Sequence, residues 1–103
     1  KGITDSWKDS QATIDCLGFV EGICCPHYDE EPERIPYVKK ILEANEITEC
    51  YGVEGYAALH LIDDKPRYNI SFKKDTSCHH VFLGNNKVHH KNIDGTIEVD
   101  LWK

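Results

Sequence analysis

A short apolar run that a proline brings to an end limits how this chain can fold. The run lies within residues 17–25 and stops at Pro26, which lacks a backbone donor and biases Cys25 toward an extended conformation. A proline in this place is typical of the end of a strand. His27 is therefore expected where a strand runs out, and in open α/β sheets ligands bind beyond the carboxyl ends of the strands. A histidine there can act as a general acid or base, although a surface histidine solvated by acidic neighbours would have the same sequence.

A helix is predicted after this histidine. Residues 29–31 followed by Pro32 indicate a helix start, because acidic residues favour the positive end of the helix dipole and proline suits the first turn. Asn45 is expected to end the helix, and Pro36 lies early enough to be tolerated. The apolar residues between them are spaced by three and four, which gives one face for packing on a sheet: Ile35, Val38, Ile41 and Leu42.

The rest of the chain is predicted to be mostly strands. Residues 1–13 are polar and are interpreted as a loop, and residues 14–25 as an irregular strand interrupted by glycines. The later strands are predicted at residues 47–53, 79–83 and 96–102, with a hairpin of residues 57–62 and 67–72 across residues 63–66, and with turns at residues 84–86 and at Asp94-Gly95. This order is one α/β unit followed by an antiparallel meander. The strands that would flank the parallel part are missing, so apolar edges are left to be covered.

The length and the net charge of the chain narrow the range of functions that it can have. The 103 residues are interpreted as a single partial domain, residues 1–103, with 18 acidic and 12 basic side chains and a net charge of -6. Negative charge disfavours nucleic acid or an anionic membrane as a partner, and no apolar run approaches the roughly 18 to 20 residues of a membrane span. A cytoplasmic location is therefore predicted. The sequence has no methionine and begins at Lys1, so we expect a processed product or a piece of a longer protein.

The cysteines and histidines lack a metal-binding pattern. The cysteines are odd in number and have no zinc-type spacing, so reduced and buried thiols are expected at Cys16, Cys24, Cys25, Cys50 and Cys78. Alternate strand residues face opposite ways, so each of two histidine pairs could give a metal one ligand at most. The histidines concerned are His79, His80, His89 and His90, with His60 elsewhere. Exposed histidines, with no metal and no cofactor, are the expectation.

A catalytic role for His27 requires a carboxylate that orients its imidazole. Asp5 and Glu54 both lie at predicted loop ends. Glycines on both sides of Glu54, at positions 52 and 55, let the backbone approach closely. The acidic residues 29–31 are explained more simply by the helix start.

The role also requires a nucleophile, and the sequence offers none in a recognisable setting. None of the serines, at positions 6, 10, 71 and 77, lies in a G-x-S-x-G elbow after an apolar strand. A pair of Cys25 with His27 across Pro26 is the other arrangement, but a buried structural thiol is favoured over it.

Three stretches together resemble the C-terminal half of the peptidase E-like serine peptidases, the aspartyl dipeptidases of family S51. They are GITDSW at residues 2–7, LGFVEGICCPHYDEEPER at residues 17–34 and YGVEGYAAL at residues 51–59, and the C-terminal meander matches in its general pattern. The resemblance implies the C-terminal half of a flavodoxin-like, class I glutamine amidotransferase-like α/β sheet. It also implies a serine hydrolase that cleaves short peptides, including those with an N-terminal Asp. By this resemblance His27 matches the catalytic histidine, and Asp5 and Glu54 both match acidic residues that can orient it.

The resemblance implies a serine from outside this sequence, because the family's G-x-S-A-G motif lies just upstream of the segment like residues 2–7. We therefore expect the parent to be a dipeptidase and this chain alone to be inactive. The expected partners are a short peptide substrate and the missing N-terminal half of the domain, or another chain that covers the sheet edge. His27 is expected to face a crevice shared with Asp5 or Glu54. The alternative is a non-catalytic α/β module that binds a partner or a metal.

Overall fold

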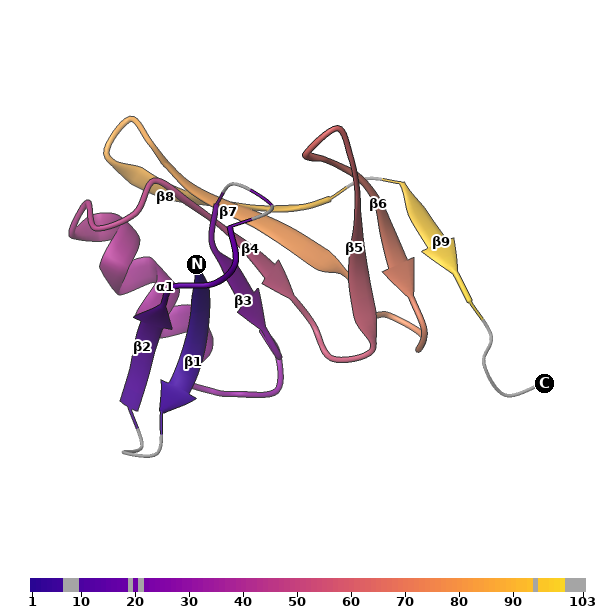
Figure 1. Cartoon of the computed structure of the whole chain (residues 1–103), viewed down its shortest axis with the longest axis horizontal. Coiled ribbons are helices and arrows are strands. Elements are labelled where there is room, and N and C mark those ends of the chain that lie inside the picture. The colour runs from indigo at the N-terminus through magenta and orange to yellow at the C-terminus, as the bar shows by residue number, and fades with distance from the viewer. Residues whose placement is uncertain (7–9, 19, 21, 94, 100–103) are drawn as a thin grey trace.

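Strands dominate the computed structural model, which describes residues 1–6, 10–18, 20, 22–93 and 95–99. In Figure 1 the helix lies beside the larger of the two sheets, and the smaller sheet leads toward the C-terminus. The elements, in chain order, are β1 (Gly2–Ser6), β2 (Ser10–Ile14), β3 (Cys24–Pro26), α1 (Arg34–Glu43), β4 (Glu49–Val53), β5 (Ala57–Ile62), β6 (Lys65–Ser71), β7 (Cys78–Gly84), β8 (Lys87–Asn92) and β9 (Thr96–Glu98).

Both sheets are mixed. The larger has the order β2-β1-β3-β4-β7-β8, in which β1, β3 and β4 are parallel and the other neighbours are antiparallel. The smaller has the order β5-β6-β9, with β6 parallel to β9. The predicted α/β class is confirmed, but the meander is not one sheet. The β5-β6 hairpin forms a second sheet, and β7 returns to pair with β4.

The prediction that residues 1–13 form a loop is wrong. β1 and β2 form an antiparallel ladder in which Gly2 pairs with Ile14, although their composition is polar. Ile3 is buried, so one apolar side chain fixes the strand on the core while tertiary pairing overrides local preference. The predicted strand over residues 14–25 is correspondingly shorter and begins at Cys24.

The helix begins five residues later than the predicted start at residue 29. Residues 27–33 are turns and bends, and α1 starts at Arg34. Its end is as predicted, since Asn45 has φ 58° and the amides of Asn45 and Glu46 bond the carbonyls of Leu42 and Ile41, both at 3.0 Å. These two bonds form the Schellman arrangement that satisfies the last carbonyls of a helix. The helix α1 has ten residues. In the described part of the chain, no helix is long and apolar enough to cross a membrane.

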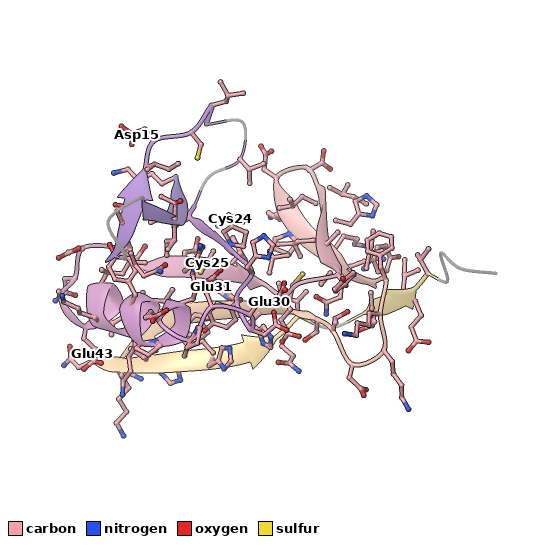
Figure 2. All side chains as sticks on the ribbon, turned by 90° about the horizontal axis from the view of Figure 1, so that it is seen from below. Asp15, Cys24, Cys25, Glu30, Glu31 and Glu43 are labelled. Atoms are coloured by element: carbon pink, nitrogen blue, oxygen red, sulfur yellow. The ribbon has the colours of Figure 1, made fainter. Side chains whose placement is uncertain are left out.

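The core lies between α1 and one face of the larger sheet. Val38, Ile41 and Leu42 of the helix are buried there with Cys25 and Cys50 of the strands. Burial raises the pKa of the Cys25 thiol to about 11, so this group stays protonated and is unsuited to act as a nucleophile. The opposite side of β3 is open to solvent, and Figure 2 shows Cys25 toward the helix and Cys24 away from it.

The free cysteines divide into two groups. Cys25, Cys50 and Cys78 are buried as expected, whereas Cys16 and Cys24 are exposed. The sequence missed the exposure of Cys24 because neighbours on a strand face opposite sides of the sheet, and the helix covers one side.

Two predicted turns are confirmed and are tight. Asp63 and Asp64 have φ of 51° and 63° between β5 and β6, and Asn85 and Asn86 have φ of 52° and 62° between β7 and β8. Positive φ at both central residues is the geometry that matches strand twist in a two-residue hairpin, and Asn and Asp tolerate it. The predicted Asp94-Gly95 turn and the end of the strand at 100–102 lie outside the described residues.

Candidate active site

His27 lies where the sequence predicted it, at the carboxyl end of β3. Its φ of 51° turns the chain out of the strand, in a backbone region that costs a residue other than glycine about 1 kcal/mol. The buried Arg34 holds this corner, because its Nη1 donates to the carbonyls of Ile3 at 2.8 Å and Pro26 at 3.1 Å. One guanidinium therefore ties β1 to the residue before His27. Sequence analysis missed this role, since Arg34 fell near the start of the predicted helix and no partner across the fold was expected for it.

Among the side chains that the structure describes, the acid that contacts His27 is Glu30. His27 Nδ1 and Glu30 Oε1 are 3.0 Å apart, and the two side chains are 62% and 48% exposed. Solvent weakens such a pair, which contributes little to stability but leaves the imidazole accessible. Glu30 was interpreted as a helix-start residue. The signal that could have found it is its spacing of three from a histidine in a segment that turns before the helix.

Two close approaches bring the loop after β3 against the end of β4. Gly55 N–H donates to Asp29 Oδ1 at 2.9 Å, and the Glu30 carboxylate occupies the space that a side chain at position 55 would need. The ring of Tyr28 packs on Gly52, where a Cβ would lie 2.6 Å from the ring. The close approach predicted at these glycines is confirmed, and its occupants are the residues that follow His27.

Glu54 follows β4 at the same edge, with partners other than His27. Its Oε2 is hydrogen-bonded to His79 Nε2, and its Oε1 accepts the Ser77 amide at 3.3 Å. The side chains of His79 and Glu54 are 9% and 16% exposed. The structure thus brings Glu54 near the His27 loop and occupies both of its oxygens elsewhere.

Asp5 belongs to β1, the strand next to β3. The parallel ladder pairs Gly2 with Cys24, and β1 continues to Ser6, whereas β3 ends at Pro26, directly before His27. Parallel strands end at the same edge of a sheet, so both residues lie at the carboxyl ends of neighbouring strands. The Asp5 side chain lies outside the described part of the structure.

The histidines are not a metal centre in the described part of the chain, where no group of three His, Cys, Asp or Glu residues could hold an ion. The rings of His79 and His90 stack with centroids 4.7 Å apart, His80 bonds Glu49 at 2.8 Å, and His89 contacts the Gly84 carbonyl at 3.0 Å. The expectation that these histidines are exposed is wrong for His79, which is 7% exposed. Its side chain faces the same side of β7 as the buried Val81.

Burial controls the electrostatics behind His27. It raises the pKa of Tyr28 to about 12, so this phenol stays neutral at physiological pH. It also lowers the pKa of His90, an effect that neighbouring His79 strengthens and Glu54 opposes. Burial therefore favours the neutral form of both Tyr28 and His90.

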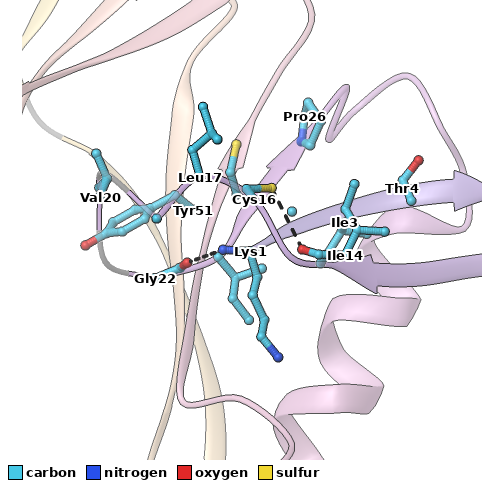
Figure 3. A pocket seen from close by; sticks show the side chains of 14 residues that line it. Lys1, Ile3, Thr4, Ile14, Cys16, Leu17, Val20, Gly22, Pro26 and Tyr51 are labelled. Atoms are coloured by element: carbon cyan, nitrogen blue, oxygen red, sulfur yellow. Dashed lines mark hydrogen bonds between the residues drawn. The ribbon is translucent and has the colours of Figure 1, made fainter.

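An apolar cavity of about 580 Å³ opens on the face of the larger sheet that α1 does not cover. Leu17, Val20 and Tyr51 surround it, together with exposed Cys24 and Pro26 of β3 (Figure 3). Leu17 is 85% exposed and Ile14, which also lines the cavity, is 49% exposed. Large apolar side chains open to water in one patch are typical of a surface that another element covers.

Comparison with known proteins places this geometry in a family. The model of Peptidase family S51 matches residues 1–68, which include His27, both candidate acids and the segment between them. The chain is also 28% identical over 88 residues to a Bacillus subtilis (strain 168) protein described as uncharacterized peptidase YgaJ. That match covers 85% of this chain and 38% of the relative, so the chain spans well under half of the relative's length. No solved structure matches the chain.

Proposed function

The chain belongs to peptidase family S51, and we propose that it supplies the acid-base half of a serine-type peptidase acting on short peptides, including dipeptides with an N-terminal Asp. The observation that carries the proposal is His27, an accessible imidazole at the carboxyl end of a parallel strand within the matched segment. In the proposed reaction His27 takes the proton of an attacking serine hydroxyl and returns it to the leaving amine.

Asp5 is the acid that we propose to orient the imidazole. The strand order supports it, because β1 is the parallel neighbour of β3, and the offset of 22 residues, extended beyond Pro26, would bring Asp5 level with His27. Glu54 remains the second candidate, and for that role it would have to exchange its bond with His79 for one with His27. The exposed Glu30 is bonded to Nδ1, the nitrogen that an orienting acid would use, so it competes for the same atom.

The serine is proposed to come from a second polypeptide segment that covers the apolar cavity. None of the 103 residues forms a G-x-S-x-G elbow. Parallel strands are normally covered on both faces, whereas α1 covers one face of β1, β3 and β4 here. The cavity borders β3, the strand that ends just before His27. A segment bound there would therefore reach the edge of the sheet at which His27 lies.

Reconstitution tests this proposal. The chain would be mixed with the part of the Bacillus relative that lies outside the matched segment, and hydrolysis of an Asp-Leu dipeptide would be measured. We expect turnover from the mixture and from neither part alone, with a loss of about 10³-fold or more for His27→Ala, because removing one triad member costs several orders of magnitude. The matched control is His60→Ala, an exposed histidine of β5 that should leave the rate unchanged.

The same assay separates the acids. Asp5→Asn is expected to lower kcat by about 10³ to 10⁴-fold if Asp5 holds the imidazole tautomer, and Glu54→Gln by much less. Full activity of the reconstituted His27→Ala protein would contradict the proposal. Tight binding of the two parts without turnover would instead favour the alternative of a non-catalytic interaction module, for which the exposed apolar cavity is the supporting observation.

A further inference from the structure

His79 is a buried polar side chain, and a buried polar group requires a structural explanation. Its residue exposure is 7%, and its Nε2 is hydrogen-bonded to Glu54 Oε2. Its Nδ1 is buried without a hydrogen-bond partner among the described residues. A ring proton on Nε2 satisfies the carboxylate, whereas a second proton on Nδ1 would be a buried donor with nothing to accept it. The geometry therefore favours the tautomer that donates from Nε2 to Glu54.

Two separate paths lead from this ring to the residues around His27. In the first, the His79 ring lies 5.4 Å from the ring of Tyr28, the residue next to His27. Tyr28 is buried, and its amide donates to the Val53 carbonyl at 3.0 Å. The aromatic contact thus holds the beginning of the loop against the end of β4.

The second path runs through Glu54. His79 and the Ser77 amide hold the Glu54 carboxylate, and this fixes the chain at the end of β4. The next residue, Gly55, donates its amide to Asp29 and provides the space that Glu30 occupies. Glu30 in turn bonds His27. A displacement of Glu54 would therefore reach the imidazole through covalent neighbours and two hydrogen bonds.

We propose that His79 is a positioning residue for His27, acting through Tyr28 and through the Glu54–Gly55 corner. The inference deepens the proposed function and rests on it for the meaning of His27. The positioning of His27 by His79 can be tested on this chain alone, without substrate. The His90 ring stacks on the His79 ring with centroids 4.7 Å apart and lies 5.7 Å from the Tyr28 ring, so the three rings form one cluster.

Substitutions that keep or move the donor test the proposal. A glutamine amide can occupy the place of imidazole Nε2, whereas an asparagine amide reaches only as far as Nδ1. His79→Gln should preserve the bond to Glu54 and His79→Asn should lose it, at nearly equal polarity. His89→Asn is the control, since this half-buried histidine of β8 contacts the Gly84 carbonyl and neither Glu54 nor Tyr28.

The measurements use the full chain without any substrate. NMR would follow the exchange rates of the Gly55 and Tyr28 amides and the ¹⁵N shifts of the His27 ring. In His79→Asn we expect both amides to exchange about tenfold faster, by loss of one stabilising bond, and the His27 ring signals to move. In His89→Asn all of these signals should stay at their original values. In His79→Gln, which keeps the bond to Glu54 but loses the ring contact with Tyr28, the Gly55 amide should exchange at its original rate. Helix amides such as that of Leu42 report a common fold in all three.

Unchanged Gly55, Tyr28 and His27 signals in a folded His79→Asn protein would overturn the proposal. Equal changes of the Gly55 amide in the glutamine and asparagine variants would also overturn it, because they would show that the donor to Glu54 does not hold this corner. If reconstitution gives turnover, His79→Asn should lower kcat with little change in KM, and His79→Gln should restore it. If reconstitution fails, the peptidase proposal is the part affected, since the NMR result stands apart from it.

Discussion

Two histidine–carboxylate pairs lie at one edge of the larger sheet, and they differ in almost every physical respect. His27 and Glu30 are three residues apart and are 62% and 48% exposed. His79 and Glu54 are 25 residues apart in sequence and are 9% and 16% exposed. The first pair joins residues of one loop, whereas the second joins the end of β4 to β7.

The difference shows where stability and chemistry lie in this corner. Water competes with the exposed pair, so it can rearrange at little cost when a substrate or another carboxylate arrives. The buried pair has no such competitor, and removing one member leaves the other polar group unsatisfied. An exposed imidazole supported from behind by a buried pair is a suitable arrangement for acid-base chemistry.

The largest effect is expected from breaking the buried pair. Glu54→Ala removes the acceptor of both His79 and the Ser77 amide, and it should lower the free energy of unfolding by about 2 kcal/mol or more. Urea unfolding followed by circular dichroism measures this change. The matched substitution in the exposed pair, Glu30→Ala, should change it by less than about 0.5 kcal/mol. Equal losses in the two variants would remove the distinction between the pairs.

A second prediction compares the two glycines that receive the loop. Gly52→Ala places a Cβ 2.6 Å from the buried Tyr28 ring and should cost about 1 to 3 kcal/mol, because a packed ring cannot move away freely. Gly55→Ala meets the end of the flexible Glu30 side chain, so it should cost less and displace that carboxylate from His27. Urea unfolding of both variants gives the order. A larger loss at position 55 would contradict it.

Much of this corner could be predicted from the sequence, and the failures have a physical pattern. Pro26 marked the strand end, Asn45 the helix end, and the glycines beside Glu54 the close approach, since each of these signals is local. Partners across the fold were beyond reach. His79 was expected to be exposed because nothing in its neighbourhood indicates that Glu54, 25 residues away, lies against it.

The helix start failed for a related reason. Acidic residues before a helix ordinarily stabilise its first turn, and this interpretation was applied to residues 29–31. In the structure Asp29 accepts the Gly55 amide and Glu30 contacts His27, so tertiary partners use both side chains and the helix begins at Arg34. The β1–β2 strands were missed likewise, because their pairing with each other, and that of β1 with β3, rather than their composition makes them strands.

A third prediction concerns which ring nitrogen of His27 carries the proton. The substitution that tests it should affect stability less than chemistry. Glu30 favours the tautomer that carries its proton on Nδ1, because that nitrogen donates to the carboxylate and leaves Nε2 free to accept a proton. Glu30→Gln should shift the ¹⁵N signals of the ring toward a mixture of tautomers. The ring signals of His79 should not move, since its partner is Glu54. Unchanged His27 signals would show that Glu30 does not influence the exposed ring.

The smallest effect is expected in the pH dependence of the buried side. Burial and the nearby His79 lower the pKa of His90 from its ordinary 6.5, so the folded state binds this proton less readily than the unfolded chain. The resulting stability is therefore present above pH 6.5 and is lost as the pH falls through the lowered folded value. Urea midpoints measured near neutrality and near pH 5 should differ more for the parent protein than for His90→Asn, which lacks the titrating group. Because His90 is exposed, solvent screens the effect and the difference should be small. An equal pH response in both proteins would show that His90 does not contribute to the acid sensitivity of the fold.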